Sequence, residues 1–286
     1  MPTALANSEE SRALSIDKFQ FTLTWLGQAG FELKFGRRTL LIDPYLSDSL
    51  AKKYQGKLFP HLRMVASPIQ PENISECDYL LCTHSHTDHM DPETILPIVK
   101  KLNPKIIYPR FEKEIAHTRG IPTDKNVGCN FGEVLKTDFS AEIYPIPAAH
   151  EELVRNEAGD FKALGYVIKW KNFSIYHSGD CIPFEGQAEL LRNLGVNIAL
   201  LPVNGRDNFR SQNGVPGNFN YSEAVTLCNQ AGIELLIPHH WGMFEFNTAS
   251  QSDLEILKNT QSPKVIVPAI SEPMTFSYNE SGIECE

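Results

Sequence analysis

The chain has 286 residues, with 26 Lys and Arg against 35 Asp and Glu, so its formal net charge at pH 7 is −9. Hydrophobic residues make up 42% and charged residues 21% of the sequence, which excludes disordered, collagen-like and coiled-coil compositions. The acidic balance argues against a general nucleic-acid binder but not against a local cationic site for a small anion. The sequence has no run of about 18 apolar residues and no basic start followed by an apolar stretch, so we expect neither a membrane span nor a signal peptide.

Short β-like runs follow a polar start. Residues 1–18 are polar and predict a loose N-terminal arm. Alternating apolar and polar residues then predict a meander of half-buried strands at Phe21–Trp25, Gly30–Phe35 and Thr39–Ile42. Residues 46–77 show no clear period and predict a long loop with one helical turn, and long loops in compact domains are often functional.

A buried strand then leads almost directly into a helix. The apolar run Tyr79–Thr83 predicts a strand buried on both faces, and the polar stretch His84–His89 follows it at once. Asp91 and Pro92 are typical of an N-cap and a first helical position, which predicts a helix over Glu93–Lys101.

Strands and helices alternate through the rest of the chain, and the mixture of meanders and β–α units favours an α/β sandwich over a doubly wound sheet. The sequence contains no repeat and no Pro/Gly/Ser-rich linker, so we expect residues 19–286 to form one domain. Further strands are expected at Lys105–Tyr108, Glu142–Ile146, Gly165–Trp170, Phe173–His177, Ile198–Val203, Leu235–Ile237 and Val265–Val267. Further helices are expected at Glu185–Asn193, Ser222–Ala231 and Ser252–Lys258.

Six cysteines are spread along the chain without a CxxC pair, and several lie inside apolar runs. We therefore expect reduced, mostly buried thiols in a cytoplasmic protein, and a disulfide framework is the alternative.

The pattern His84-x-His86-x-Asp88-His89 carries the most chemical information. His84 and His86 lie two residues apart on an extended segment, so both side chains can point to the same side. Asp88 and His89 follow in a turn that can direct them to a neighbouring position. Imidazole nitrogens and a carboxylate oxygen suit Zn²⁺, Fe²⁺ or Mn²⁺. A solvated polar loop before a helix is the alternative interpretation.

These four residues cannot complete two metal sites, but three later places can contribute further ligands. His150, Asp180 and the pair His239-His240 each follow a β-like run that would deliver them to a common edge. Each alone would more often be a structural polar residue, and the first motif makes the ligand interpretation the better one.

Together these residues resemble a known family. The stretch from Thr83 to His89, followed by His150, Asp180 and His240, reproduces in order the ligand pattern of the metallo-β-lactamase superfamily, and the resemblance covers about residues 20–280. Finer motifs are similar to the L-ascorbate-6-phosphate lactonase-like branch: Thr24–Gly30, Leu41–Pro44, Tyr176–Asp180 and Ile237–His240. The lactonases are longer, so their substrate does not transfer with the resemblance.

The resemblance implies a four-layer αββα sandwich with one or two divalent metal ions, Mn or Zn, at one edge of the sheets. It implies one site of His84, His86 and His150, a second site of Asp88, His89 and His240, and Asp180 bridging the two.

The pattern leaves two interpretations for His239 and for Asp43, and it assigns no ligand position to His177. His240 matches the family's Pro-x-His spacing better than His239, which is the alternative ligand, and His177 has no ligand position. Asp43 could accept the free N–H of a ligating histidine or simply form a turn before Pro44.

These ligands imply hydrolysis. A water shared by two cations loses its proton more readily and can attack a carbonyl or phosphorus, with Asp88 as the catalytic residue that orients it and handles its proton. We expect a metal-dependent hydrolase of a small lactone or ester, phosphorylated or not. The alternatives are a phosphodiesterase acting on a lipid or nucleotide, and a non-catalytic metal-binding scaffold. A flavo-diiron oxidoreductase is disfavoured because that branch typically has Glu at the position of His86.

Substrate selection is expected in the loop after Ile198–Val203. Asn204, Arg206 and Arg210 lie there, and the two arginines could hold a phosphate by bidentate contacts, whereas an ordinary solvated loop is the alternative. Trp241 is a further candidate, and Tyr45 and Phe244 are aromatic residues that could line the same pocket. The expected partner is a small-molecule substrate, with no nucleic acid, and the lactonase resemblance suggests a homo-oligomer.

Overall fold

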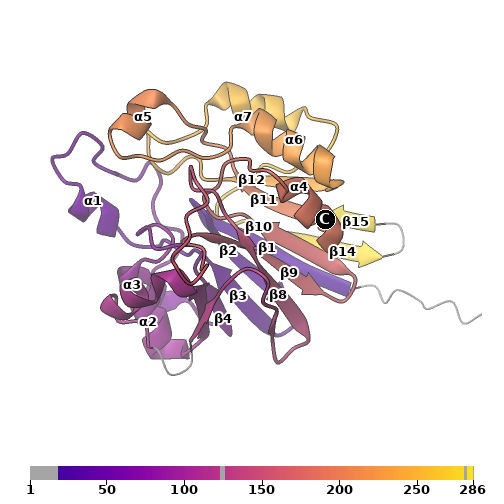
Figure 1. The fold of residues 1–286 in the computed structure, drawn as a ribbon, viewed down its shortest axis with the longest axis horizontal. Coiled ribbons are helices and arrows are strands. Elements are labelled where there is room, and N and C mark those ends of the chain that lie inside the picture. Colours follow the sequence, from indigo (N-terminus) through magenta and orange to yellow (C-terminus); the bar gives the residue numbers. More distant parts are fainter. Residues whose placement is uncertain (1–18, 123–125, 280–281, 286) are drawn as a thin grey trace, which may run out of the picture.

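The strands of this protein form two mixed β-sheets that pack face to face, and helices cover the outer face of each sheet (Figure 1). The computed structural model describes residues 19–122, 126–279 and 282–285, so the predicted arm at residues 1–18 lies outside the described part. The layer order is helix, sheet, sheet, helix, and the expected αββα sandwich is confirmed.

The first sheet contains the N-terminal meander and the strand that leads to the histidine motif. Its strands lie side by side in the order β15 (Gly282–Cys285), β14 (Pro273–Asn279), β1 (Phe19–Gly27), β2 (Gly30–Phe35), β3 (Arg38–Ile42), β4 (Tyr79–Leu81), β5 (Lys105–Pro109) and β6 (Val127–Cys129).

The second sheet is built from the later part of the chain. Its order is β13 (Lys264–Val265), β12 (Leu235–His239), β11 (Ile198–Pro202), β10 (Phe173–His177), β9 (Leu164–Trp170), β8 (Ala141–Pro147) and β7 (Leu135–Lys136).

The helices lie in two outer groups and in the loops around the site. The short helices α1 (Ser49–Lys53), η1 (Pro71–Asn73), η2 (Arg110–Glu112) and α5 (Asn208–Gln212) belong to connections. The others are α2 (Pro92–Leu102), α3 (Lys113–Thr118), α4 (Gln187–Leu194), α6 (Tyr221–Ala231) and α7 (Gln251–Lys258). None of the described helices is long and apolar enough to cross a membrane.

The main core lies between the sheets and is made by alternating strand residues. On β2, Phe31, Leu33 and Phe35 point into this core, while Glu32 and Lys34 between them are half-buried on the other face. Burial of a large apolar side chain of this kind contributes about 1.5–3 kcal/mol.

β4 has no alternation of apolar and polar residues, because both of its faces are covered. Its Leu81 faces the core between the sheets, and its Leu80 faces the outer core under α2 with Ile95 and Ile98. A strand covered on both faces needs apolar residues at every position, as the sequence predicts.

Helix α2 begins where the sequence predicts. The Asp91 side chain accepts a hydrogen bond from the backbone N–H of Glu93, and Pro92 occupies the first turn. Pro92 has no N–H to leave unpaired there, so the helix start costs little. Because α2 begins directly after the histidine motif, its start fixes the end of that loop.

The expected strands and helices are present, but several elements are absent from the sequence-based prediction. β14 was detectable in the sequence, because the apolar residues Met274 and Phe276 alternate with the polar residues Thr275 and Ser277. β7 contains two residues, too few for a periodic pattern, and the strand expected at Val265–Val267 is present as the two-residue β13, Lys264–Val265.

Five cysteines are buried free thiols: Cys77, Cys82, Cys129, Cys181 and Cys228. Burial raises the pKa of Cys77, Cys129, Cys181 and Cys228 to about 12, so these thiols stay protonated and act as small core residues. For these positions, the expectation of buried thiols without disulfides is confirmed.

Gly165 on β9 gives a test of the packing around the site. A Cβ at this position would lie 2.7 Å from the carbonyl oxygen of His177 and 3.0 Å from the Cα of Ser178. We expect Gly165→Ala to lower the free energy of unfolding by about 1–3 kcal/mol, because backbone atoms cannot move aside cheaply. Urea unfolding measures this, with Gln230→Ala on the exposed face of α6 as a control that stays within about 0.5 kcal/mol of the parent. A fully stable Gly165→Ala protein would contradict this packing.

Candidate metal centre

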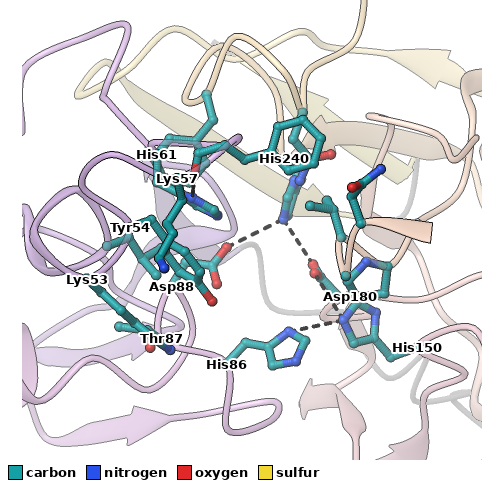
Figure 2. A pocket seen from close by; sticks show the side chains of 18 of the residues that line it. Lys53, Tyr54, Lys57, His61, His86, Thr87, Asp88, His150, Asp180 and His240 are labelled. Carbon is teal, nitrogen blue, oxygen red and sulfur yellow. Dashed lines mark hydrogen bonds and ion pairs between the residues drawn. The ribbon is translucent and has the colours of Figure 1, made fainter. Parts of the chain in front are cut away.

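The predicted ligands converge because their strands end at the same edge of the sandwich. β3 and β4 are parallel, and β10, β11 and β12 are parallel in the other sheet. β8 runs in the same direction as β10, since both are antiparallel to β9. The residues after these strands therefore meet at one edge, where Figure 2 shows several of them facing a common space.

A first cluster contains His84, His86, His150 and Asp180, with one ligand atom of each within 4.8 Å of the others. The three rings lie with their centroids 4.6–4.9 Å apart. Nε2 of His150 lies 3.1 Å from Nδ1 of His86. Three imidazoles and one carboxylate oxygen are a donor set that suits Zn²⁺ or Mn²⁺.

A second cluster contains Asp88, His89 and His240, again with ligand atoms within 4.8 Å of one another. Asp180 lies between the clusters. Its Oδ1 is 3.3 Å from Nε2 of His89. The same Oδ1 is 3.3 Å from Nε2 of His240, and its Oδ2 is 3.8 Å from Nε2 of His150 (Figure 2). The carboxylate thus faces both clusters, as the bridging position requires.

Buried polar atoms without partners show that these residues fit metal ions. Nε2 of His84, Nε2 of His89 and Oδ1 of Asp180 are buried and have no hydrogen-bond partner in the structure. Leaving such an atom unsatisfied costs about 1–3 kcal/mol. Three of them directed into one site indicate that this edge is built to hold cations.

The histidines of the first cluster are neutral. Burial lowers the pKa of His150 to about 3, and burial together with the neighbouring imidazoles holds the pKa of His84 well below its ordinary value. A neutral ring keeps the lone pair that a metal ion needs, so both histidines are ready to bind one at neutral pH.

The second cluster requires positive charge. Burial alone would lower the pKa of His89, but the carboxylates of Asp180, Asp43 and Asp88 outweigh it and raise that pKa well above its ordinary value. Burial would likewise raise the pKa of Asp180, yet His240 and His89 hold it well below its usual range. The carboxylates around His89 therefore favour a cation at this position.

Asp43 orients the histidine motif through contacts with Nδ1 of His89 and with Thr83, on the side of the ring opposite to Nε2. Its Oδ2 lies 2.6 Å from Nδ1 of His89 and accepts a 2.6 Å hydrogen bond from the hydroxyl of Thr83, while its Oδ1 accepts the Thr83 backbone N–H at 2.8 Å. This arrangement directs Nε2 of His89 into the cluster. Of the two roles considered for Asp43, the structure supports the contact with a ligating histidine.

Gln28 is a site residue that sequence reasoning missed. Its Nε2 donates to Oδ2 of Asp88 at 2.8 Å and lies 3.0 Å from Nε2 of His240. The backbone carbonyl of Gln28 accepts a hydrogen bond from the backbone N–H of His240 at 2.9 Å. In the sequence, Gln28 could be noticed only as a member of the motif Thr24–Gly30. Its contacts with Asp88 and His240 are seen only in the fold.

The adjacent histidines at the end of β12 point to different places. His240 has a φ of 60°, and this left-handed turn directs its ring toward Asp88 and Asp180. His239 is outside both clusters and stacks on His177 with ring centroids 4.8 Å apart. His177 is satisfied by the backbone, since Nε2 contacts the carbonyl of Ala29 at 2.8 Å and Nδ1 accepts the N–H of Gly179 at 3.0 Å.

A pocket of about 560 Å³ opens above the clusters (Figure 2). Its floor includes residues of both clusters: His86, Asp88, His150, Asp180 and His240. Its wall comes largely from the segment after β3: Leu50, Lys53, Tyr54, Lys57, Leu58, Phe59 and His61. The remaining lining residues are Ser85, Thr87, Arg119, Asn213, Gly214, Val215, Pro216, Phe244 and Asn247.

Neither of the two predicted arginines, Arg206 and Arg210, is among the described residues that line this pocket, although Arg210 donates a hydrogen bond to Asn247 of the lining. Arg206 makes a bidentate contact with Glu223 at 2.6 and 2.7 Å, and the Nε of Arg210 lies 2.5 Å from Asp207. Both guanidinium groups already have a carboxylate partner, so the interpretation as a phosphate clamp is not supported.

The other predicted substrate residues also lie outside the lining. Asn204 hydrogen-bonds with Asn218 and Asn247 inside the loop. Trp241 packs on Trp25 with ring centroids 4.7 Å apart, and Tyr45 is buried under Arg63. Of the aromatic candidates, only Phe244 lines this pocket.

Comparisons with known proteins agree with this architecture. A family model described as the beta-lactamase superfamily domain matches residues 38–241. A UPF0173 metal-dependent hydrolase of Caldivirga maquilingensis is 26% identical over 245 residues, covering 86% of this chain and 92% of that protein. One of Methanoculleus marisnigri is 29% identical over 242 residues, covering 83% and 87%.

Solved structures share the fold. An isothiocyanate hydrolase from Delia radicum gut bacteria superposes with a TM-score of 0.70 at 19% identity, covering 88% of this chain and 98% of the other. A metallo hydrolase from the hyperthermophilic archaeon Ignicoccus hospitalis gives 0.65 at 20% identity, covering 90% and 98%.

The orientation of the adjacent histidines leads to a test by metal content. We expect His240→Ala to lower the metal bound per chain more than His239→Ala does, because only His240 faces the clusters. Elemental analysis of the purified variants measures this. His239→Phe, which keeps a ring in the same core, is the matched control and should retain the parent's metal content. Metal loss in the His239 variants with a normal content in His240→Ala would show that His239 is the ligand.

The buried histidines also predict how the stability of the metal-free protein depends on pH. Burial lowers the pKa of His84, His150 and His177 in the folded protein. In the unfolded chain these histidines bind protons near pH 6.5, whereas in the folded protein they remain neutral at that pH, so acid favours unfolding. His89 has a raised pKa and acts in the opposite direction, but it is outnumbered. We therefore expect the urea concentration at the midpoint of unfolding, measured with a chelator present, to decrease as the pH is lowered from about 7 to about 5. A flat or rising midpoint would contradict the neutral state of these rings.

Proposed function

The chain belongs to the beta-lactamase superfamily domain family, and on this premise we propose that it is a metal-dependent hydrolase of small esters or lactones. The donor set, the access from the pocket and the names of its relatives as metal-dependent hydrolases support the proposal. The sequence motifs similar to the L-ascorbate-6-phosphate lactonase-like branch favour a lactone or ester over other substrates.

The observation that carries this proposal is that both clusters border an open pocket. Structural metal sites are closed by protein ligands, whereas catalytic sites keep a position open to solvent or substrate. His86 and His150 of the first cluster and Asp88 and His240 of the second all line the pocket. This access favours a catalytic centre over a non-catalytic metal-binding scaffold.

Asp88 is the residue best placed to handle a proton. Its Oδ2 is held by Gln28, and it lies at the pocket floor 3.7 Å from Nε2 of both His89 and His240. Burial alone would raise the pKa of Asp88, but His89 and His240 hold it below its ordinary value, so the carboxylate is ionised at neutral pH. It can accept a hydrogen bond from a water molecule and then take its proton.

Bound divalent ions would lower the pKa of water toward neutrality and stabilise negative charge on the oxygen of the substrate. His84, His86, His150, His89 and His240 would hold them with Asp88 and Asp180. The protein supplies the rest: Asp43 and Gln28 orient these side chains, and the pocket admits a small molecule.

A substrate panel tests the proposal. The purified protein is analysed for metal and then assayed with a lactone, a carboxylate ester, a thioester and a phosphodiester in the presence of Mn²⁺ or Zn²⁺. We expect metal-dependent hydrolysis of the lactone or ester, lost on adding a chelator. Hydrolysis of the phosphodiester alone would support the alternative phosphodiesterase, and no turnover by fully loaded protein would indicate a scaffold.

Replacement of Asp88 tests its role in the reaction. We expect Asp88→Asn to lower kcat/KM by about 100-fold or more, because an amide cannot take the proton of water. Metal content and the unfolding curve are measured on the same sample, so that loss of metal is separated from loss of proton transfer. Asp138→Asn, a surface carboxylate paired with Arg38, is the control and should keep the parent's activity. Activity of Asp88→Asn within a few fold of the parent would remove Asp88 from this role.

A further inference from the structure

Two lysines of the pocket wall have no carboxylate partner among the residues that the structure describes. Lys53 ends α1, and Lys57 follows four residues later; both are exposed, and both line the pocket. Their neighbour Lys52 differs, because its Nζ lies 2.6 Å from Glu93 and it is absent from the pocket lining. In a chain of net charge −9, Lys53 and Lys57 thus bring positive charge to the pocket of the candidate metal centre without a carboxylate partner among the described residues, and Nζ of Lys53 lies 5.1 Å from the centroid of the Tyr54 ring.

The segment that carries these lysines is fixed in place. Arg63 donates to the carbonyls of Tyr45 at 2.6 Å and Ser47 at 3.0 Å, and its guanidinium lies 4.7 Å from the centroid of the Tyr45 ring. The backbone N–H of Met64 donates to the carbonyl of Met243 at 2.9 Å. Both ends of the segment are therefore attached to the body of the protein, and the lysines are presented at the pocket.

The carboxylates that line the pocket belong to the metal clusters, whereas the cations of the lining do not. The carboxylates of the lining are Asp88 and Asp180, and both belong to the metal clusters. The cations of the lining are Lys53, Lys57 and Arg119. Bound metal ions would neutralise the two carboxylates and leave a pocket with positive charge at its mouth.

We propose that Lys53 and Lys57 bind an anionic group of the substrate, a carboxylate or a phosphate, at the end remote from the bond that is broken. This inference rests on the proposed hydrolase function and replaces the arginine loop as the anion-binding element. The same lining contains the apolar side chains of Leu50, Leu58 and Phe244, which can contact the apolar middle part of such a substrate. Figure 2 labels Lys53 and Lys57 among the side chains that line the pocket.

Three ligands of equal chain length test this arrangement by binding alone. Hexanoate, adipate and 6-phosphohexanoate share one carboxylate and differ at the other end, which is a methyl group, a carboxylate or a phosphate. We expect the metal-loaded parent to bind one or both of the doubly anionic ligands more tightly than hexanoate in titration calorimetry. The double variant Lys53→Gln/Lys57→Gln should lose about 3- to 30-fold of that preference, while its affinity for hexanoate stays within about 2-fold. The ligand that loses more shows which anion the site prefers.

Lys52→Gln is the matched control, because it removes a lysine from the same helix outside the pocket lining and should keep the preference of the parent. The preference of the parent should also fall as salt rises, since exposed charges are screened. An unchanged preference in the double variant, or an equal loss in Lys52→Gln, would overturn the proposal.

A kinetic comparison separates this inference from the proposed function. The parent and the double variant are assayed with mono(4-nitrophenyl) adipate and with 4-nitrophenyl hexanoate. We expect the double variant to lose kcat/KM for the adipate ester only, mainly through KM. If the loaded parent hydrolyses neither ester, the proposed ester hydrolysis is contradicted, and the calorimetric titration still decides whether the lysines bind the anion.

Discussion

Three carboxylates, the buried Asp43 and Asp180 and the half-buried Asp88, surround the imidazole of His89, and the rest of the site depends on compensating this concentration of charge. Asp43 contacts Nδ1 of the ring at 2.6 Å, while Asp180 and Asp88 approach Nε2 at 3.3 and 3.7 Å. Buried carboxylates are costly unless they are paired or bind metals. The hydroxyl and N–H of Thr83 partly compensate Asp43, and Gln28 donates to Asp88. The atoms that remain unsatisfied face the position where cations fit.

The backbone around the site is shaped to make this arrangement possible. Gln28, Asp43 and His240 all have a positive φ, which costs a residue other than glycine of the order of 1–3 kcal/mol. Gly179 also has a positive φ, and a Cβ there would lie 2.6 Å from Cβ of Thr83. The turn that delivers Asp180 therefore requires glycine, because the strand carrying the histidine motif packs directly against it.

The pocket combines two parts with different origins. Its floor is carried by the ends of parallel strands, which are held by the core between the sheets, so the ligand geometry is preorganised. Its wall is carried by the connection between β3 and β4, whose apolar and cationic side chains are partly exposed. Changes in this wall can alter which substrate is accepted without disturbing the metal centre, since few core contacts depend on it.

The sequence by itself determined the layer architecture, most strands and the seven candidate ligands. The strands follow from local alternation and apolar runs, whereas the four-layer arrangement and the ligand set follow from the resemblance of these motifs to the metallo-β-lactamase superfamily. Only the tertiary structure decided that Arg206 pairs with Glu223, that Gln28 contacts Asp88, and that Lys53 and Lys57 line the pocket. Those outcomes depend on contacts between residues far apart in the chain and on single backbone angles, neither of which leaves a periodic signal in the sequence.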